Sequence, residues 1–143
     1  MVEKMQLHVV TSTDADIKAT VTEVYIPAFK GTAGVLGNHK PYISLLTPGE
    51  VSYKDIDNKK HYLYIRDGIL EVLKNNISII SDTVEKGETL DPQAIEKKLA
   101  ELDTRIKSSL KGEITPDELQ QALDEQREYT AKHKIIQKIQ QGK

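Results

Sequence analysis

The spacing of the apolar residues changes close to Glu88, and this change limits the possible folds more than any other feature of the 143-residue chain. Before Glu88, apolar and polar residues alternate in short runs separated by turn residues, which is typical of strands with one buried face. From Asp91 onward glycine nearly disappears and the apolar residues recur at the helical period. We therefore expect a β-rich domain at residues 1–86 and a helical domain at residues 87–143.

The N-terminal part is expected to form many short strands. In the segment from Ile17 to Pro27, the apolar phase slips by one residue after Val21, which predicts a β-bulge near Thr22 and Glu23. Pro27 is expected to end that strand, because proline has no N–H to donate. Short strands at this spacing favour a small sandwich or barrel over alternating strands and helices. The expected strands cover residues 5–9, 17–26, 42–46, 51–53, 61–65, 69–73 and 77–80.

Two helices are expected in the C-terminal part, each with a defined start. Asp91 and Thr115 are the expected N-caps, and each is followed by a proline at the first helical position. Glu118 lies where a capping box requires a carboxylate. The second helix carries few apolar residues before a tail rich in lysine and glutamine. The expected apolar positions are Ile95, Leu99, Leu102, Ile106 and Leu110 in the first helix, and Leu119, Ala122 and Leu123 in the second.

This apolar stripe is thin. Burial of one Leu or Ile side chain contributes about 1.5–3 kcal/mol, whereas ordering the backbone costs about 1–2 kcal/mol for each residue before hydrogen bonds are counted. We therefore expect the helical hairpin to be marginally stable by itself and to depend on docking. This makes the hairpin a candidate switch.

Composition excludes several classes of function. The chain has 20 Lys and Arg residues against 22 Asp and Glu residues, so it lacks the positive charge that nucleic-acid binding requires. It contains no cysteine, which excludes thiol nucleophiles and cysteine-ligated zinc. The apolar run near the N-terminus is too short for a signal-peptide core or a membrane span. We expect an intracellular protein without direct membrane insertion and without nucleic acid as a partner.

The sequence contains no motif for catalysis or for a metal site. The glycine-rich residues 31–37 match neither dinucleotide-binding nor P-loop spacing, and a strand is expected to follow them, so a structural turn is favoured over a phosphate site. The histidines at positions 8, 39, 61 and 133 lack metal-site spacing, although His39 is a candidate contact residue. The serines at positions 44, 52, 78 and 81 do not lie in a nucleophile-elbow motif. We expect no catalytic residue and no metal.

The helical part carries a set of basic residues with two open interpretations. The set is either an ordinary solvated face or an electrostatic docking surface for an acidic partner. Its members are Lys97, Lys98, Arg105, Arg127, Lys132 and Lys134.

Four motifs follow one another in the N-terminal part. They are Gly34-Val35-Leu36-Gly37-Asn38-His39-Lys40-Pro41, Leu45-Leu46-Thr47-Pro48-Gly49, Asp67-Gly68-Ile69-Leu70-Glu71-Val72 and Asn76-Ile77-Ser78-Ile79-Ile80-Ser81-Asp82-Thr83. Their order and spacing closely resemble those of the epsilon subunit of F-type ATP synthases, and the resemblance spans essentially the whole chain. The chain departs from the family pattern at Gly37, Asn38 and Asp67, which bear on loop shape.

The resemblance implies a fold of the α+β class. Its parts are an N-terminal β-sandwich, packed as a flattened barrel of short antiparallel strands, and a C-terminal antiparallel helical hairpin. It also implies a non-catalytic rotor subunit of the central stalk, bound to the gamma subunit and to the ring of c subunits, with contacts to the catalytic beta and alpha subunits. The contact residues that it implies for gamma and the c ring are Gly31, Thr32, Gly34, Val35, Leu36, His39 and Pro41.

The resemblance further implies helices that move between a folded hairpin and an extended form that blocks ATP hydrolysis. Some members of the family bind ATP through an Ile/Leu-Asp-x-x-Arg-Ala motif at the start of the first helix. Leu90 and Asp91 match this motif, but Ala94 replaces the arginine, and an aliphatic side chain cannot make charge-assisted bonds to phosphate. We expect weak or absent ATP binding and no other cofactor.

The leading hypothesis is therefore a rotor-stalk subunit that couples proton flow to ATP synthesis and restrains ATP hydrolysis. It places the chain peripherally on the cytoplasmic face of the bacterial inner membrane, with the plastid thylakoid as the alternative, because the chain shows no transit-like leader. The first rival is a stand-alone adaptor whose β-domain and helical arm bind other proteins. The second is a small hydrolase, which requires a pocket where Ser, His and a carboxylate converge.

Overall fold

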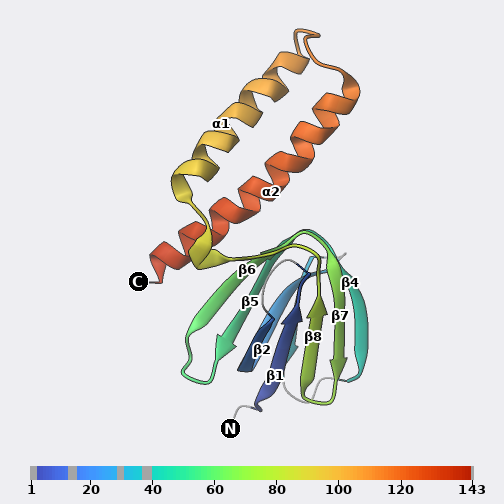
Figure 1. Ribbon diagram of the computed structural model, residues 1–143, viewed down its shortest axis with the longest axis vertical. Helices are drawn as coiled ribbons and strands as arrows, with labels where there is room; N and C mark the ends of the chain where they lie inside the picture. Colours follow the sequence, from blue (N-terminus) through green and yellow to red (C-terminus); the bar gives the residue numbers. More distant parts are fainter. Residues whose placement is uncertain (1–2, 13–15, 29–30, 37–39, 143) are drawn as a thin grey trace. The chain divides into compact units, whose positions relative to one another are not determined.

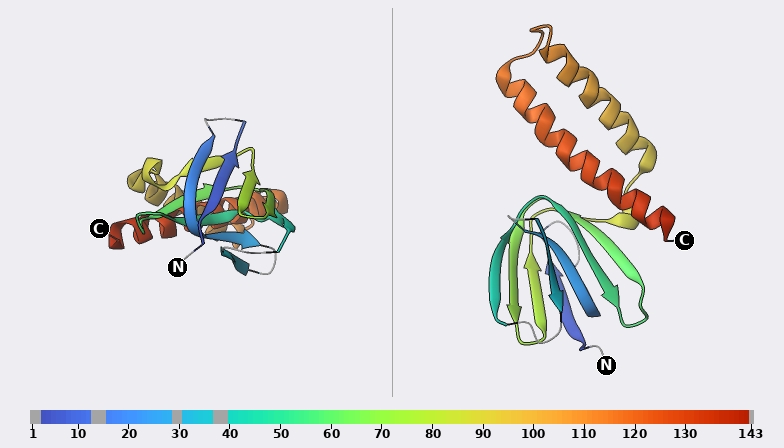
Figure 2. Two further views of the ribbon diagram at one scale, coloured as in Figure 1. Left: turned by 90° about the horizontal axis from the view of Figure 1, so that it is seen from below. Right: turned by 180° about the vertical axis from the view of Figure 1, so that it is seen from behind.

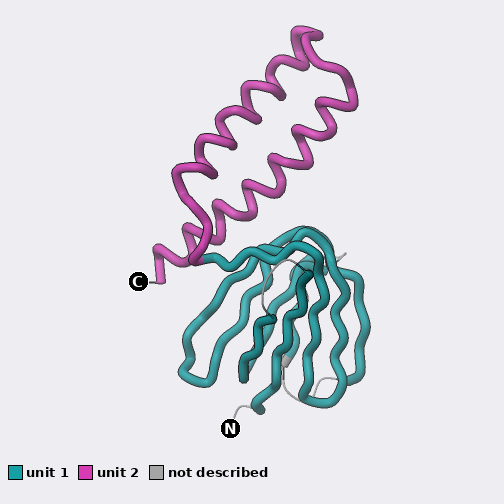
Figure 3. Tube along the Cα trace, viewed as in Figure 1, with its two compact units in different colours: residues 1–87 teal, residues 88–143 magenta. Residues whose placement is uncertain are grey.

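The computed structural model describes residues 3–12, 16–28, 31–36 and 40–142. The chain divides into two compact units, Met1–Gly87 and Glu88–Lys143, called unit 1 and unit 2 below (Figure 3). The boundary falls where the apolar period changes from that of strands to that of helices.

Unit 1 is built from strands. Within the described residues it contains nine strands, which form one continuous sheet. They are β1 (Met5–Val10), β2 (Ile17–Ala28), β3 (Gly31–Leu36), β4 (Tyr42–Leu46), β5 (Gly49–Asp55), β6 (Lys60–Ile65), β7 (Gly68–Leu73), β8 (Asn76–Ile80) and β9 (Val84–Lys86). The short strand β9 was not expected from the sequence.

The sheet folds over into two layers (Figures 1 and 2). One layer follows the order β1, β8, β7, β4, in which β1 and β8 are parallel and the other neighbours are antiparallel. The other layer contains β5, β6 and β9 with the second half of β2, which also pairs with β3. Because the first half of β2 pairs with β1, strand β2 belongs to both layers. The expected flattened β-sandwich is confirmed, except that one of its strand pairs is parallel.

A β-bulge allows β2 to serve both layers, since a bulge bends and twists its strand. The pairing register of β2 with β5 shifts between Val21 and Glu23, which confirms the bulge expected at this place. The expectation that Pro27 ends the strand is wrong, because β2 continues to Ala28. Pro27 has no N–H to donate. Its carbonyl oxygen nevertheless accepts a hydrogen bond from the Thr47 N–H at 3.1 Å, so Pro27 still takes part in backbone hydrogen bonding.

Strand β3 lies where the sequence predicted a turn. Each residue from Gly31 to Leu36 pairs with a residue of β2. Gly34 leaves room for an aromatic ring, since a Cβ at this position would lie 3.0 Å from Cε1 of Tyr25. Glycine is depleted in strands, and for this reason the segment resembles a loop in sequence. The predicted turn is therefore wrong for residues 31–36.

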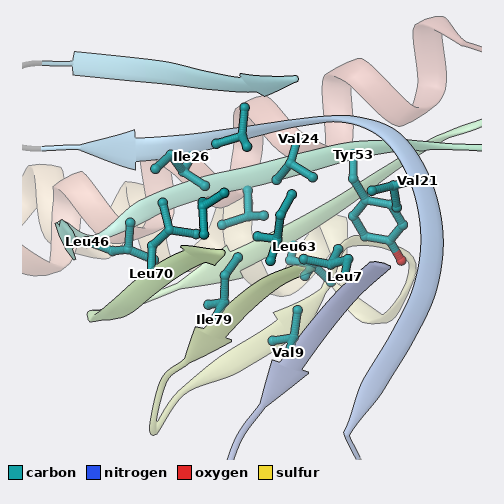
Figure 4. Packing of buried hydrophobic residues seen from close by; sticks show 14 of the residues in the cluster. Leu7, Val9, Val21, Val24, Ile26, Leu46, Tyr53, Leu63, Leu70 and Ile79 are labelled. Carbon is teal, nitrogen blue, oxygen red and sulfur yellow. The ribbon is translucent and has the colours of Figure 1, made fainter. Parts of the chain in front are cut away.

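The core of unit 1 lies between the two layers (Figure 4). Alternate residues of the strands point into it, as Leu70 and Val72 of β7 do. Burial of these side chains removes apolar surface from water and is the main favourable term in folding. The buried cluster consists of Met5, Leu7, Val9, Val21, Val24, Ile26, Val35, Leu46, Val51, Tyr53, Leu63, Ile65, Leu70, Val72, Ile77 and Ile79.

Unit 2 contains α1 (Pro92–Ser109) and α2 (Pro116–Gln141), which pack against each other as an antiparallel hairpin. A short 3-10 helix, η1 (Gly87–Thr89), precedes α1. Both predicted N-caps are confirmed. Asp91 Oδ1 accepts hydrogen bonds from the N–H groups of Gln93 and Ala94, at 3.0 and 3.3 Å. Thr115 Oγ1 accepts one from the Glu118 N–H at 3.1 Å, and its hydroxyl donates to Glu118 Oε1 at 3.2 Å.

The apolar stripe of the hairpin differs from the expectation at both ends. Ile95 and Leu102 of α1 are buried, but Leu110 is 89% exposed because α1 has ended and Leu110 is its C-cap. The tail of α2, expected to be polar, contains the buried residues Ile135 and Ile136. No helix in the described part of the chain is long and apolar enough to cross a membrane.

Candidate functional site

The outward face of the layer β1-β8-β7-β4 carries a line of apolar side chains. Val10 of β1 pairs with Ile80 of β8. Ile80 pairs with Ile69 of β7, and Ile69 pairs with Leu45 of β4. Residues paired in this way lie on the same face of a sheet. These four residues, called the apolar row below, therefore stand in one line across four strands.

The apolar row faces away from the core. Leu45 is 74% exposed, Ile80 56% and Ile69 46%, whereas the residues next to them in sequence, Leu46, Ile79 and Leu70, are buried. Ile43 and Leu73, at 72% and 50% exposed, add to the apolar surface of β4 and β7. Contiguous exposed apolar side chains mark surfaces that another protein covers. The apolar row is therefore the candidate attachment surface of unit 1.

Sequence reasoning placed Leu45, Ile69 and Ile80 in strands but did not identify the surface. A usable signal is present, because Leu45-Leu46, Ile69-Leu70 and Ile79-Ile80 are adjacent apolar pairs. Successive residues of a strand face opposite sides of the sheet, so each pair directs one apolar side chain outward. Strands that are apolar on both faces are typical of sheets that are covered on both sides.

The contact residues implied for segment 31–41 have mixed exposure. Thr32, Gly34 and Pro41 are exposed, as is Gly31. Val35 is a correction, because it is 2% exposed and belongs to the core, so its side chain is not available to a partner. Leu36 closes β3, and His39 lies outside the described residues.

Three of the six basic residues expected to form one face, Lys98, Arg105 and Lys132, are engaged within the hairpin. Lys98 lies 3.3 Å from Glu125, and Arg105 lies 3.7 Å from Glu118, so these two pairs join α1 to α2. Lys132 is a correction, because it is 5% exposed and cannot belong to a solvated face.

The remaining basic residues are exposed. Arg127 lies 3.8 Å from Asp124 on the same helix. Lys97 and Lys134 make no ion pair with any residue that the structure describes. Exposed ion pairs contribute little to stability. An acidic partner can therefore bind Lys97 and Lys134 without breaking an ion pair that already exists in the described part of the chain.

A polar cluster that the sequence did not predict lies at the end of the β5–β6 hairpin. Asp55 accepts hydrogen bonds from the N–H groups of Asp57 and Lys59, at 2.8 and 3.0 Å, and from His61 Nε2 at 2.8 Å. The His61 ring stacks on Tyr53, with 4.8 Å between ring centres. The hydrogen bond from His61, followed by that from the Lys59 N–H, lowers the pKa of Asp55. This cluster holds the hairpin tip in shape.

The residues of the nucleotide motif serve a structural purpose. The Asp91 carboxylate is occupied as the N-cap of α1, and Ala94 is exposed on the first turn. Among the described residues, no three His, Asp or Glu side chains are grouped so that they could hold a metal ion. A β-sandwich with an exposed apolar row and an attached helical hairpin defines a class of protein that acts by binding other proteins.

Comparison with known proteins identifies the family. Residues 4–87 match the family described as ATP synthase, Delta/Epsilon chain, beta-sandwich domain. The ATP synthase epsilon chain of Desulfosudis oleivorans is 34% identical over 108 residues, which cover 76% of this chain and 81% of that one. The epsilon chain of Solibacter usitatus is 36% identical over 93 residues, which cover 65% and 69%.

Solved structures show the same fold. A chain of the Euglena gracilis mitochondrial ATP synthase, in a structure of OSCP, F1 and the c-ring, has a TM-score of 0.73 at 21% identity and covers 91% of this chain and 83% of that one. A chain from the central stalk and c-ring of the Tetrahymena thermophila enzyme has a TM-score of 0.56 at 14% identity, covering 94% and 98%.

The chain therefore belongs to the ATP synthase delta/epsilon chain family, as an epsilon chain. The resemblance identified from its motifs is confirmed. An epsilon chain is a non-catalytic subunit, and the catalytic sites of ATP synthase lie on other subunits.

Proposed function

We propose that this chain is the subunit of the central stalk that joins the gamma subunit to the c ring and restrains ATP hydrolysis through α1 and α2. It thereby helps to couple proton translocation to ATP synthesis. Family membership over unit 1 supports this proposal, together with the assemblies named for the two structural neighbours. The observation that carries it is the apolar row, because a sandwich that exposes such a row requires a partner to cover it.

In this proposal unit 1 attaches the chain to the rotor. The apolar row meets the gamma subunit, and the exposed residues of segment 31–41 face the c ring and the foot of gamma. The chain lies peripherally at the membrane, on the cytoplasmic face in a bacterium. The stand-alone adaptor is the competing proposal, and it predicts that gamma and the c ring do not bind.

Charge substitutions in the apolar row test the attachment. Leu45 and Ile69 are exposed, so Leu45→Lys and Ile69→Lys leave the core unchanged but place charges in a contact that must lose water. The double variant is expected to bind gamma and the c ring at least about tenfold more weakly in a co-purification titration. Ile56→Lys is the matched control, since Ile56 is 55% exposed in the β5–β6 turn, outside the row. Equal loss of binding in the control would reject the apolar row as the attachment surface.

Unit 2 is the regulatory part in this proposal. Lys97 and Lys134, which make no ion pair in the described part of the chain, are the first basic contacts for acidic surfaces of the catalytic subunits. Lys98 and Arg105 become available only if their partners on the facing helix are released.

Regulation by direct ATP binding is not part of this proposal. Ala94 offers no charged group to phosphate, and the Asp91 carboxylate is occupied by the N–H groups of α1. Equilibrium dialysis of ATP against the purified chain is expected to show no tight binding, and tight binding would refute this part of the proposal.

A further inference from the structure

Strand β7 carries one charged side chain among the residues that face away from the core. Its core-facing residues are Leu70 and Val72. Because successive residues of a strand face opposite sides of the sheet, Ile69, Glu71 and Leu73 face outward. Ile69 and Leu73 are 46% and 50% exposed, and Glu71 is exposed between them. A carboxylate therefore stands between two apolar side chains on the outward face that also bears the apolar row.

The strands on either side of β7, which are β8 and β4, place no cation beside Glu71 (Figure 1). Glu71 pairs with Ser78 of β8 and with Ile43 of β4, which is 72% exposed. Its diagonal neighbours on the same face of these two strands are Asn76, Ile80 and Leu45. In the described strands β4, β7 and β8, the residues that adjoin Glu71 on this face are therefore all uncharged, and most of them are apolar.

The Glu71 carboxylate makes neither a hydrogen bond nor an ion pair with any residue that the structure describes. Water solvates it as long as the surface is free. A protein that covers the apolar row removes this water, and burial of an isolated ionised carboxylate is far more costly than burial of a neutral polar group. A covering protein that binds well must therefore supply a partner for the carboxylate.

We propose that the outward face around the apolar row binds an apolar protein surface that carries one arginine, and that this arginine pairs with Glu71. The inference rests on the proposed function, in which the gamma subunit covers the row, and it specifies the chemistry of gamma at this contact. A guanidinium fits because it forms two parallel hydrogen bonds with a carboxylate and is more weakly hydrated than a lysine ammonium. Glu71 then gives the surface specificity, since a purely apolar partner would leave its carboxylate unpaired.

Two substitutions of Glu71 test this pairing when the full chain is titrated against an assembly of gamma and the c ring. Both leave the core unchanged, because Glu71 is exposed. Glu71→Gln keeps the size of the side chain but removes its charge. Glu71→Leu extends the apolar surface and leaves the arginine buried without a hydrogen-bond partner. The dissociation constant is expected to rise at least about tenfold for Glu71→Gln and further for Glu71→Leu, mainly through faster dissociation.

Asp57→Asn is the matched control for net charge. Asp57 is exposed in the turn between β5 and β6, outside the layer β1-β8-β7-β4. Its substitution removes one negative charge from unit 1, as Glu71→Gln does, so any long-range attraction to a basic partner is reduced in a similar way. The dissociation constant of this variant is expected to change less than about threefold, because an exposed charge outside the contact contributes little.

Unchanged or tighter binding of the Glu71→Leu chain would show that the covering surface is apolar opposite Glu71, and it would overturn the inference. Unchanged binding of the Glu71→Gln chain, or an equal loss in the Asp57→Asn control, would overturn it too. In these cases the unaltered chain still binds, so the proposed attachment to the rotor stands and only the arginine contact is refuted. Failure of the unaltered chain to bind would reject the attachment itself, and the inference with it.

Discussion

At Gly68, strand β7 starts so close to β8 that no side chain fits. A Cβ at this position would lie 2.6 Å from the backbone carbonyl oxygen of Ile80. This oxygen cannot move away unless strand β8 moves with it. Gly68→Ala is therefore expected to lower the free energy of unfolding by about 1–3 kcal/mol. Urea unfolding of the two proteins measures this difference. Gly34→Ala is the control, because its new Cβ would meet the side chain of Tyr25, which is 37% exposed and can yield. Equal losses in both variants would contradict this account of Gly68.

The Asp55 carboxylate at the β5–β6 turn makes the free energy of unfolding depend on pH in the acidic range. Its hydrogen bonds to His61 and to the Lys59 N–H lower its pKa below the ordinary value of 3.8. A carboxyl with a lowered pKa in the folded state stabilises the fold above its unfolded pKa and loses this effect as the pH falls through the folded value. The difference in unfolding free energy between the unaltered chain and Asp55→Asn is therefore expected to shrink below pH 3.8. A difference that stays constant in urea titrations down to pH 2 would contradict this prediction.

At the scale of elements, the helix caps show which features a sequence predicts well. A cap depends on one side chain and on N–H groups a few residues away, so Asp91 and Thr115 could be recognised from local order alone. Strand β3 depends instead on pairing with β2, and its glycines concealed it. Strand β9 has only three residues, which is too short for an alternating pattern to be recognised.

The start of α2 can be tested through its cap. Thr115→Ala removes the oxygen that accepts the Glu118 N–H and is expected to destabilise the hairpin by about 0.5–2 kcal/mol. Hydrogen exchange in the first turn of α2 reports this loss. Thr104→Ala is the control, because that hydroxyl donates to the Ala100 carbonyl of its own helix at 3.1 Å and alanine is the better helix former. A larger effect at Thr104 than at Thr115 would contradict the capping assignment.

At the scale of the whole molecule, the sequence predicted the two units and the family but not the candidate attachment surface. Alternation within one strand shows that it has two faces, but pairing with the other strands decides which apolar face is buried. The apolar row could be recognised only when Ile80, Ile69 and Leu45 were brought into register from three strands. Burial of Lys132 likewise depends on packing around α2, which its charge in the sequence does not reveal.

The central claim is that unit 1 attaches the chain to the rotor and unit 2 restrains hydrolysis. The most direct measurement is the ATP hydrolysis rate of an ATPase depleted of its epsilon subunit, after addition of either the full chain or residues 1–88. Both proteins are predicted to co-purify with the rotor, and only the full chain is predicted to lower the hydrolysis rate. Equal inhibition by residues 1–88, or failure of the full chain to bind, would contradict the account.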